Sequence, residues 1–330
     1  MLSSSTQRQC IVLMCDDGYL FPSAVCAKQA REHAPASSDV VIFIETKELA
    51  GERKRVLEAA TGAMVRTIPE WLIEKLDRAV PEGFFRTHVN RAALFRLFVA
   101  QILKESYERI VYLDGDIQVR RSLAPLLTMA LPQGTVGVVP DWVALHSGDG
   151  WPYVAENRAY LGKLDLLPEH WSSYFNSGVM VASPDTWNDI GPKALDFLIE
   201  RPESCRLHDQ SALNHVCRGR TTQLSLRWNF LRQYMPLPAY EAIDPAVLHF
   251  VGRLKPWDGA YHPWTQAEFQ PYVDMALALE TAGVKWRRQS TLRRLAYRLK
   301  PYLQQDDYAD PNYRRAISDL IIRKCRETQP

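Results

Sequence analysis

Asp114 and Asp116 end an apolar run and flank a single glycine. The run before them, residues 110–113, is rich in β-branched side chains and predicts a buried strand of the parallel type. Side chains just past the carboxyl end of such a strand face the crevice where α/β folds bind ligands. Two carboxylates there need a cation or strong donors to stay ionised, and a divalent metal shared with a diphosphate would supply that cation. For a motif this short, an acidic loop is the plain structural alternative.

Further polar residues lie within or directly after apolar segments elsewhere in the chain. His249 interrupts the apolar segment 247–251, and imidazole is a common ligand of manganese and zinc. Gly252 allows a ligand to approach the backbone closely, and Lys255 carries a point charge suited to a phosphate. Asn176 lies inside another apolar segment, where its amide must find a partner. Singly, each has a structural explanation as a core, loop or backbone-bonding residue, but their conjunction is much less expected by chance.

The elements that must position these groups alternate between short apolar strands and helices. Strands are expected at residues 10–15, 39–45, 63–68, 110–113, 135–140, 174–181 and 247–251, and helices at 20–33, 90–107, 185–200 and from 208 onward. This alternation is typical of a mostly parallel sheet covered by helices. Residues 142–172 lack periodicity and contain several aromatics and glycines. They are expected to form a loop-rich insert, which is more often functional than idle.

The size and charge of the chain suggest a body with an appendage. Its 330 residues, 46% hydrophobic and 24% charged, suffice for one large α/β domain or for a domain plus an appendage. The net charge of +2 is uneven, because twelve Lys/Arg face only five Asp/Glu from residue 285 onward. We therefore expect a catalytic domain over residues 1–265 and a helical, basic C-terminal appendage over residues 266–330.

Cysteine spacing and hydropathy exclude several other classes. The six cysteines show no Cys-x-x-Cys spacing, so neither a zinc ribbon nor a dithiol redox pair is indicated. The N-terminal residues lack the basic and apolar regions of a signal peptide. No apolar run reaches the roughly 18 residues that a membrane span needs. These features predict a cytoplasmic protein.

Six segments carry a resemblance to a known family. They are Asp16-Asp17-Gly18-Tyr19, Arg96, Tyr112-Leu113-Asp114-Gly115-Asp116, Phe175-Asn176-Ser177-Gly178-Val179, Asp209-Gln210, and the stretch from His249 to Trp257, which reads His-x-x-Gly-x-x-Lys-Pro-Trp. From about residue 10 to 257 the chain resembles the family 8 retaining glycosyltransferases, the group containing glycogenin and bacterial lipopolysaccharide galactosyl- and glucosyltransferases. The final nonapeptide is the most specific of these signals. Gly18 departs from the family's usual asparagine, near the expected contact with uracil or ribose.

The resemblance implies a fold, a reaction and a set of site residues. The fold is of GT-A type, a single Rossmann-like α/β domain with a mixed, mostly parallel central sheet. The reaction moves a hexose, galactose or glucose, from a UDP-sugar to a saccharide or lipid-linked glycan acceptor, with retention of configuration and a divalent metal. By resemblance, Mn2+ or Mg2+ is bound by Asp114, Asp116 and His249. The UDP-sugar is bound by Asp16, Asp17, Tyr19, Arg96, Gly252 and Lys255. The reacting face is lined by Asn176, Asp209 and Gln210, and the acceptor side by Asp141 and Trp257.

Two other functions stay open on the sequence alone. Haloacid dehalogenase-type phosphatases also use Asp-x-Asp after an apolar strand, but their pattern requires Thr or Val two residues past the second Asp, where this chain has Gln118. A non-catalytic scaffold that binds a sugar nucleotide or a lipid is the second alternative. The intact metal and phosphate residues argue against it. Release of UDP from a panel of UDP-sugars would distinguish the enzyme from the scaffold.

The basic segment 285–303 interleaves aromatic and aliphatic residues with Lys and Arg. Such a segment suits an interfacial helix on anionic lipid, and relatives that build lipid-linked glycans carry basic aromatic tails. We therefore expect peripheral contact with the inner face of the plasma membrane. A helix that packs on the body with a charged outer face is the alternative. Nucleic-acid binding is not expected, because the body of the chain is acidic.

Overall fold

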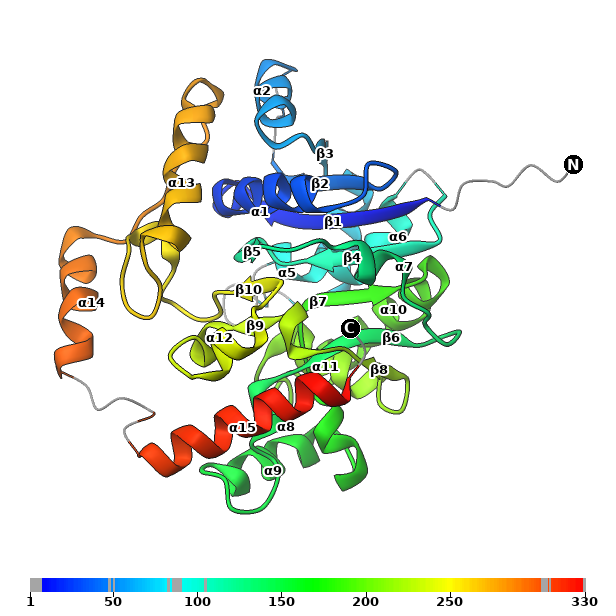
Figure 1. Cartoon of the computed structure of the whole chain (residues 1–330). Helices are drawn as coiled ribbons and strands as arrows, with labels where there is room; N and C mark the ends of the chain where they lie inside the picture. Colours follow the sequence, from blue (N-terminus) through cyan, green and yellow to red (C-terminus); the bar gives the residue numbers. More distant parts are fainter. Residues whose placement is uncertain are drawn as a thin grey trace, which may run out of the picture.

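A central seven-stranded sheet forms the core of the protein (Figure 1). The structure, a computed structural model, describes residues 8–46, 49, 51–81, 84, 91–103, 106–303, 308 and 310–328, and only the backbone of 298–303. The strands are β1 (Gln9–Asp16), β2 (Asp39–Glu45), β3 (Met64–Thr67), β4 (Arg109–Leu113), β6 (Val136–Pro140), β7 (Phe175–Ala182) and β8 (Thr221–Gln223), in the order β3-β2-β1-β4-β7-β6-β8. Among these strands, β7 alone runs antiparallel to its neighbours. The expected mixed, mostly parallel sheet is confirmed.

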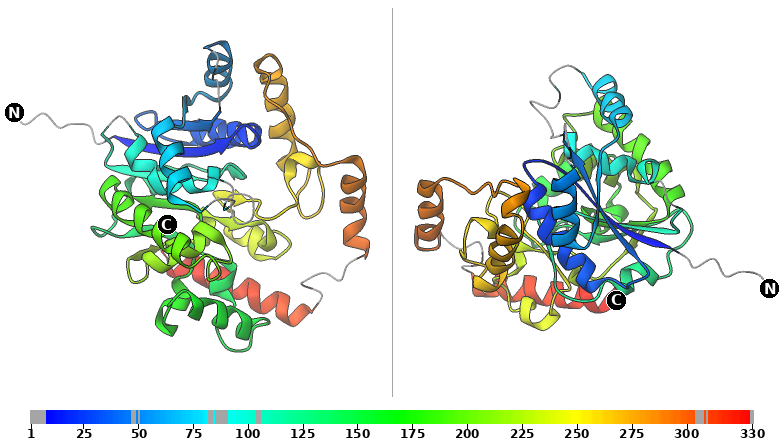
Figure 2. Two further views of the ribbon diagram at one scale, coloured as in Figure 1. Left: turned by 180° about the vertical axis from the view of Figure 1, so that it is seen from behind. Right: turned by 90° about the horizontal axis from the view of Figure 1, so that it is seen from above.

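Helices cover both faces of the sheet, as the two views in Figure 2 show. Alternate residues of β1 point to opposite faces, so that Ile11 and Leu13 join one apolar cluster and Cys10 and Val12 join the other. The first cluster includes α1 (Leu20–His33), and the second includes α10 (Pro184–Glu200) and α11 (His208–Val216). Because both faces are buried, the strands are apolar throughout rather than alternating.

A second, three-stranded sheet has the order β5-β10-β9. Its strands are β5 (Ile117–Val119), β9 (Phe230–Leu231) and β10 (Val247–His249). β10 pairs antiparallel with β5 so that His249 lies opposite Ile117. The backbone N–H of Phe250 also donates to the carbonyl oxygen of Asp116, at 3.0 Å. This register brings the end of β10 to the loop that follows β4.

Two segments differ from the sequence-based expectation. The single helix expected over residues 90–107 is three short pieces, α5 (Arg91–Leu94), the 3-10 turn η1 (Phe95–Phe98) and α6 (Val99–Ile102). Residues 90, 104 and 105 of the expected helix lie outside the described part of the chain. The loop-rich insert at 142–172 contains α8 (Trp142–Leu145), α9 (Val154–Lys163) and the 3-10 turn η2 (Pro168–Ser173). The residue before α9 is Tyr153, which has a left-handed conformation and makes no capping hydrogen bond with its side chain. The sequence therefore lacks the Ser, Thr, Asp or Asn that usually signals the start of a helix.

The C-terminal part consists of three longer helices that meet the body differently (Figure 1). They are α13 (Gln266–Ala278), α14 (Thr291–Leu303) and α15 (Pro311–Glu327). The other α-helices in the described part of the chain are α2 (Gly51–Thr61), α3 (Glu70–Ala79), α7 (Ala124–Thr128) and α12 (Ala239–Ile243). Ile317 and Ile321 of α15 are fully buried in the first apolar cluster, whereas Leu292 of α14 is 80% exposed. The division at residue 265 stays a prediction. Among the described helices, none has the length and apolarity to cross a membrane.

α10 packs closely on η1 at Gly191. Alanine at this position is expected to destabilise the protein, which is the opposite of its usual effect in a helix. Replacing glycine by alanine inside a helix normally stabilises the helix by about 0.5–1 kcal/mol. At Gly191, however, a Cβ would overlap the carbonyl oxygen of Leu97 and lie 2.7 Å from its carbonyl carbon. Gly191→Ala is therefore expected to lower the free energy of unfolding by about 2–3 kcal/mol in urea titration.

The matched control for this change is Gly162→Ala in α9. A Cβ at Gly162 meets no atom within 4 Å, so this variant should be neutral or slightly more stable. Equal free energies of unfolding for the two variants would contradict the close packing of α10 on η1.

Candidate active site

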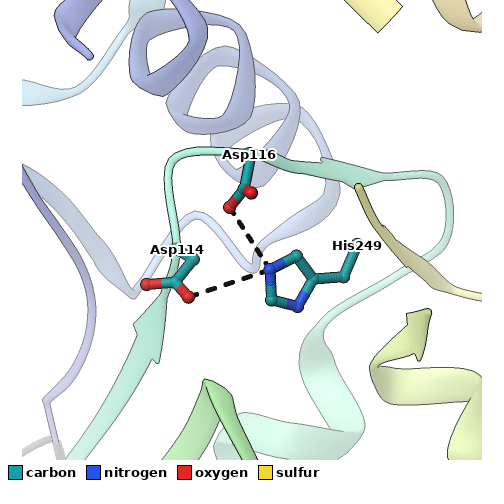
Figure 3. A group of neighbouring side chains, drawn as sticks. All are labelled: Asp114, Asp116 and His249. Carbon is teal, nitrogen blue, oxygen red and sulfur yellow. Dashed lines mark ion pairs between the residues drawn. The ribbon is translucent and has the colours of Figure 1, made fainter. Parts of the chain in front are cut away.

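Asp114, Asp116 and His249 converge where β4 ends (Figure 3). His249 Nε2 lies 3.2 Å from Asp116 Oδ1 and 3.8 Å from Asp114 Oδ2. One oxygen of each carboxylate and one imidazole nitrogen all lie within 4.8 Å of one another. The three side chains come from segments about 130 residues apart in the sequence, and the pairing of β10 with β5 brings them together. Carboxylate oxygens with one imidazole form a donor set that suits Mn2+.

The tautomer of His249 follows from a chain of hydrogen bonds. The backbone N–H of Gly178 donates to Oδ1 of Asn176, which fixes the orientation of that amide. Asn176 Oδ1 also accepts from Nδ2 of Asn229 at 2.9 Å, so Oδ1 of Asn229 faces Nδ1 of His249, again at 2.9 Å. Nδ1 must then carry the proton, and Nε2 faces the two aspartates. This tautomer is the one that leaves Nε2 free to bind a metal.

Lys255 completes the ion-pair network on the side of Asp116. Its Nζ donates to Asp116 Oδ2 at 2.5 Å and to the carbonyl oxygen of Phe250 at 2.8 Å. Burial alone would raise the pKa of Asp116, but the charge of Lys255 outweighs it and holds that pKa well below its usual range. Asp116 is therefore ionised at neutral pH, and the ammonium group of Lys255 is held beside it.

Arg96 links Asp114 to the opposite side of the site. Although only 7% exposed, its guanidinium lies 2.9 Å from Asp114 Oδ1 and 3.1 Å from Asp209 Oδ2. Its Nε–H donates to the carbonyl of Ala93, so the contact with Asp209 is an ion pair without hydrogen-bond geometry. Burial raises the pKa of Asp209, while Arg96 opposes this rise. The arginine neutralises two carboxylates that would otherwise repel each other.

Gln210 is the centre of a buried polar network beside Asn176. Its Oε1 accepts from the side chain of Asn176 at 3.0 Å and from the backbone N–H of Ser177 at 3.2 Å. Its Nε2 donates to Asp141 at 3.4 Å and to the hydroxyl of Tyr174 at 3.3 Å. Asp141 also accepts from Asn176, at 3.2 Å. With both ends of its amide engaged, Gln210 is held in one orientation.

The segment after β1 forms a second wall of the site. Asp16 Oδ1 accepts from the backbone N–H of Tyr19 at 2.8 Å, and Asp17 pairs with Arg53 at 2.6 Å. A cavity of about 250 Å³ lies between this segment and the β4 loop; it is lined by Met14, Cys15, Asp16, Tyr19, Ala92, Ala93, Arg96, Tyr112, Asp114, Gly115 and Asp116. A Cβ added to Gly18 would lie 2.9 Å from Arg287 Nη1. The departure from asparagine at Gly18 thus leaves room for an arginine from the C-terminal part.

Two predicted site residues lie apart from the network around Gln210. Trp257 packs edge-on against Tyr19 with ring centroids 5.7 Å apart, so it adjoins the segment after β1. Gly252 has a φ of 85°, a left-handed conformation that glycine adopts without strain, and lines a second, larger cavity. The acceptor-side role of Trp257 and the donor role of Gly252 stay predictions.

The sequence of the chain matches a known family over most of its length. The sequence model described as Glycosyl transferase family 8 matches residues 10–260. The chain belongs to this family. The match covers every site residue discussed above except Arg287, and it removes the phosphatase alternative. As a family 8 protein, the chain is a glycosyltransferase.

Individual relatives are distant. General stress protein A of Bacillus subtilis is 25% identical over 249 residues, covering 70% of this chain and 81% of that protein. Lipopolysaccharide 1,2-glucosyltransferase of Escherichia coli is 27% identical over 202 residues, covering 57% of this chain and 54% of the relative. The chain therefore spans about half the length of the latter. A solved structure of the galactosyltransferase LgtC with donor and acceptor sugar analogues aligns with a TM-score of 0.61 and 19% identity, over 82% of this chain and 95% of that one. This likeness supports the GT-A fold.

Two residues of this family 8 protein were not found by sequence reasoning. Asn229 lies in a short irregular segment after Trp228, and no periodicity or motif distinguishes its amide from a surface asparagine. Arg287 belongs by composition to a basic tail, although the structure places it beside Gly18. Both act through tertiary contacts between distant segments, which a single sequence does not reveal.

Asn229→Ala is expected to weaken metal binding while the protein stays folded. The change removes the acceptor that fixes His249 Nδ1–H, and the removal of such a supporting group costs about 10–100-fold in metal affinity. Isothermal titration with Mn2+ measures this directly. Asn312→Ala, which replaces an exposed asparagine of α15, is the control. An affinity within twofold of the wild type would contradict the role of Asn229.

Proposed function

We propose that this protein is a retaining hexosyltransferase that moves galactose or glucose from a UDP-sugar to a saccharide or lipid-linked glycan. The observation that carries the proposal is the convergence of Asp114, Asp116 and His249 at the end of β4, with Lys255 beside them. In a chain of this family, such a group at the ligand-binding edge of the sheet suits a sugar nucleotide and its metal.

The two aspartates and His249 would hold the divalent metal. Their oxygen and nitrogen atoms lie within 4.8 Å of one another, and the hydrogen bond from Nδ1 to Asn229 leaves Nε2 for the ion. When bound, Mn2+ or Mg2+ supplies positive charge to the diphosphate as the anomeric C–O bond breaks. We favour Mn2+ because one of the three ligands is an imidazole.

Positive groups of the chain itself would assist the same leaving group. Lys255 donates to Asp116 and so lies at the edge of the proposed metal site, where its ammonium group could also meet a phosphate oxygen. Arg96 holds Asp114 and lines the 250 Å³ cavity, which we assign to the donor together with Asp16 and Tyr19. Such fixed charges stabilise a developing diphosphate without reorganisation. Asp17 and the backbone of Gly252 complete the proposed donor contacts.

Gln210, Asp209 and Asn176 form the proposed reacting face. Oε1 of Gln210 is fixed by two donors, so its partial negative charge can stabilise the positive charge that develops on the sugar. An amide is a poor nucleophile, which argues against a covalent intermediate of the kind used by retaining hydrolases. We infer a front-face path in which the leaving phosphate oxygen accepts the proton of the acceptor hydroxyl as the new C–O bond forms.

The names of relatives suggest the substrates. A lipopolysaccharide glucosyltransferase of Escherichia coli and a lipopolysaccharide galactosyltransferase of Salmonella typhimurium are among the similar proteins. We therefore propose glucose or galactose as the transferred sugar and a surface glycan as the acceptor.

A donor panel tests this function. The protein is incubated with Mn2+ and, separately, UDP-glucose, UDP-galactose, UDP-N-acetylglucosamine and UDP-galacturonate, and release of UDP is measured with and without saccharide acceptors. We expect turnover of UDP-glucose or UDP-galactose, and an α-linked product by NMR. Binding without any turnover would favour the scaffold alternative, and a β-linked product would contradict retention.

Membrane contact by residues 285–303 is a separate proposal. Leu292 and Leu295 of α14 are 80% and 53% exposed beside Arg293 and Arg294, which suits the surface of an anionic membrane at the cytoplasmic face. The start of the segment instead packs on the body, where Trp286 Nε1 donates to the carbonyl of Trp257 at 3.0 Å. The fraction of protein that sediments with phosphatidylglycerol vesicles should fall when both leucines are changed to Gln. An unchanged bound fraction would contradict the proposal.

A further inference from the structure

Residues 284–290, which connect the 3-10 turn η6 (Glu280–Ala282) to α14, are held against the body at both ends. We call them the connector. Near its start, the ring of Trp286 stacks on Phe21 of α1, with centroids 5.2 Å apart and 21° between the planes. Trp286 Nε1 also donates to the carbonyl oxygen of Trp257 at 3.0 Å. The start of the connector is therefore fixed against α1 and the segment after β10.

The end of the connector is held by Asp258, a residue that is only 1% exposed. Its Oδ1 accepts from the backbone N–H of Gln289 at 2.7 Å, and its carbonyl oxygen accepts from Nη2 of Arg288 at 2.9 Å. The guanidinium of Arg288 also lies 4.7 Å from the ring centroid of Trp286. These anchors on both sides of Arg287 fix the position of its backbone.

Arg287 itself is directed at the turn that follows β1. Its Nη1 lies 2.9 Å from the position of a Cβ added to Gly18, and Asp16 Oδ1 lies 3.0 Å from the same position. A guanidinium and a carboxylate therefore lie side by side next to Gly18. Within the described part of the chain, Arg287 has no hydrogen-bond or ion-pair partner, whereas Arg288 has one. The N–H groups of Arg287 are thus available to a ligand.

The turn beside Arg287 is a wall of the 250 Å³ cavity that we assign to the donor. Asp16 and Tyr19, which flank Gly18 in the sequence, both line this cavity. The backbone N–H of Tyr19 donates to Asp16 Oδ1 at 2.8 Å, which holds the carboxylate in place. A larger side chain at position 18 would displace the guanidinium, so glycine admits Arg287 to this place. A ligand group that is bonded to Asp16 is therefore within reach of Arg287.

The carboxylate of Asp16 and the guanidinium of Arg287 together match the edge of uracil. That edge presents one donor, N3–H, between two carbonyl acceptors, O2 and O4. A carboxylate accepts from N3–H, and a guanidinium beside it donates to O4, the carbonyl oxygen farther from the ribose. Cytosine instead presents an acceptor at N3 and an amino donor at C4, so each protein group would face a group of its own kind. A phosphate at this place would lie against the carboxylate and be repelled.

We propose that Arg287 is a specificity-determining residue of the donor site, which donates to O4 of uracil while Asp16 accepts from N3–H. The inference rests on the proposed function and deepens it. It assigns a donor contact to the C-terminal part of the chain, outside the residues that match the family model. It also gives a reason for Gly18, because the guanidinium takes the room that a side chain at this position would need.

Arg287→Ala tests this contact, and Arg315→Ala is the matched control, because Arg315 of α15 is exposed and lines neither of the two cavities described above. Binding of UDP and of CDP is measured by isothermal titration with Mn2+ and without lipid, so that membrane contact plays no part. We expect the Kd for UDP to rise about tenfold in Arg287→Ala, since one charge-assisted hydrogen bond is lost. The Kd for CDP should not rise, because its amino group offers Arg287 no acceptor. The control should match the wild type with both nucleotides.

Steady-state kinetics completes the test. In Arg287→Ala the KM for the UDP-sugar should rise about tenfold while kcat stays within twofold, because the ribose and the diphosphate separate uracil from the reacting atoms. An unchanged Kd for UDP, or equal losses of affinity for UDP and CDP, would overturn the uracil contact. Sugar transfer by the wild type would still support the proposed function in that case. Failure of the wild type to bind UDP would overturn both proposals, so the two failures are distinguishable.

Discussion

Asp116→Asn is expected to lower kcat for sugar transfer about 10³-fold. The amide keeps the shape of the side chain but removes the negative charge that lies 3.2 Å from His249 and 2.5 Å from Lys255. Loss of one charge-stabilising group in an active site costs about 10²–10³-fold, and loss of a metal ligand adds to it. UDP release with saturating UDP-sugar and Mn2+ measures the effect. Asp114→Asn should behave similarly, because Asp114 is the second carboxylate of the group.

The control for both variants is Asp185→Asn, which alters an exposed aspartate in the first turn of α10. It should keep kcat within twofold of the wild type. Thermal unfolding followed by circular dichroism separates loss of function from loss of fold, since Lys255 loses its charged partner in Asp116→Asn. Near-normal turnover in a folded Asp116→Asn protein would contradict the metal assignment.

Gly178→Ala is expected to lower activity by about 100-fold or more, although Gly178 has no side chain that could act in the reaction. A Cβ at this position of β7 would overlap Cε1 of His249 and lie 2.7 Å from its Nδ1 and 2.9 Å from Asp114 Oδ2. The imidazole must then move away from the aspartates and from Asn229. Displacement of a ligand or its supporting group costs at least about 10–100-fold in metal affinity. Titration with Mn2+ should therefore show a weakened site together with the lower kcat.

Gly162→Ala is the matched control, because its new methyl group meets no atom within 4 Å. This variant should bind Mn2+ and turn over the donor as the wild type does. Wild-type Mn2+ affinity in Gly178→Ala would show that His249 does not lie against Gly178 and Asp114.

Most of the central sheet could be predicted from local sequence. Strands such as Gln9–Asp16 and Asp39–Glu45 are continuous apolar runs because helices cover both faces, and the expected boundaries differ from the observed ones by at most a residue. The region around Arg96 was not predictable in the same way. Its apolar spacing suits one long helix, but the approach of Gly191 to Leu97 is accompanied by a 3-10 turn that no local pattern announces.

The candidate site shows the same division. Asp114, Asp116 and His249 could be named because their residue types and motifs are distinctive, and the structure brings them together through the pairing of β10 with β5. The residues that orient them were not found, since Asn229 acts only by contacts with segments 20 and 53 residues away. The acceptor-side roles of Asp141 and Trp257 stay predictions.

The most direct test of the metal–diphosphate site is a crystal structure with UDP and Mn2+, measured at the manganese absorption edge. We expect one anomalous manganese peak within about 2.3 Å of Asp114, Asp116 and His249 Nε2, next to the diphosphate. We also expect Nδ1 of His249 to keep its hydrogen bond to Asn229. Bound UDP with no manganese peak at these three residues, or with the peak elsewhere, would contradict the metal–diphosphate site.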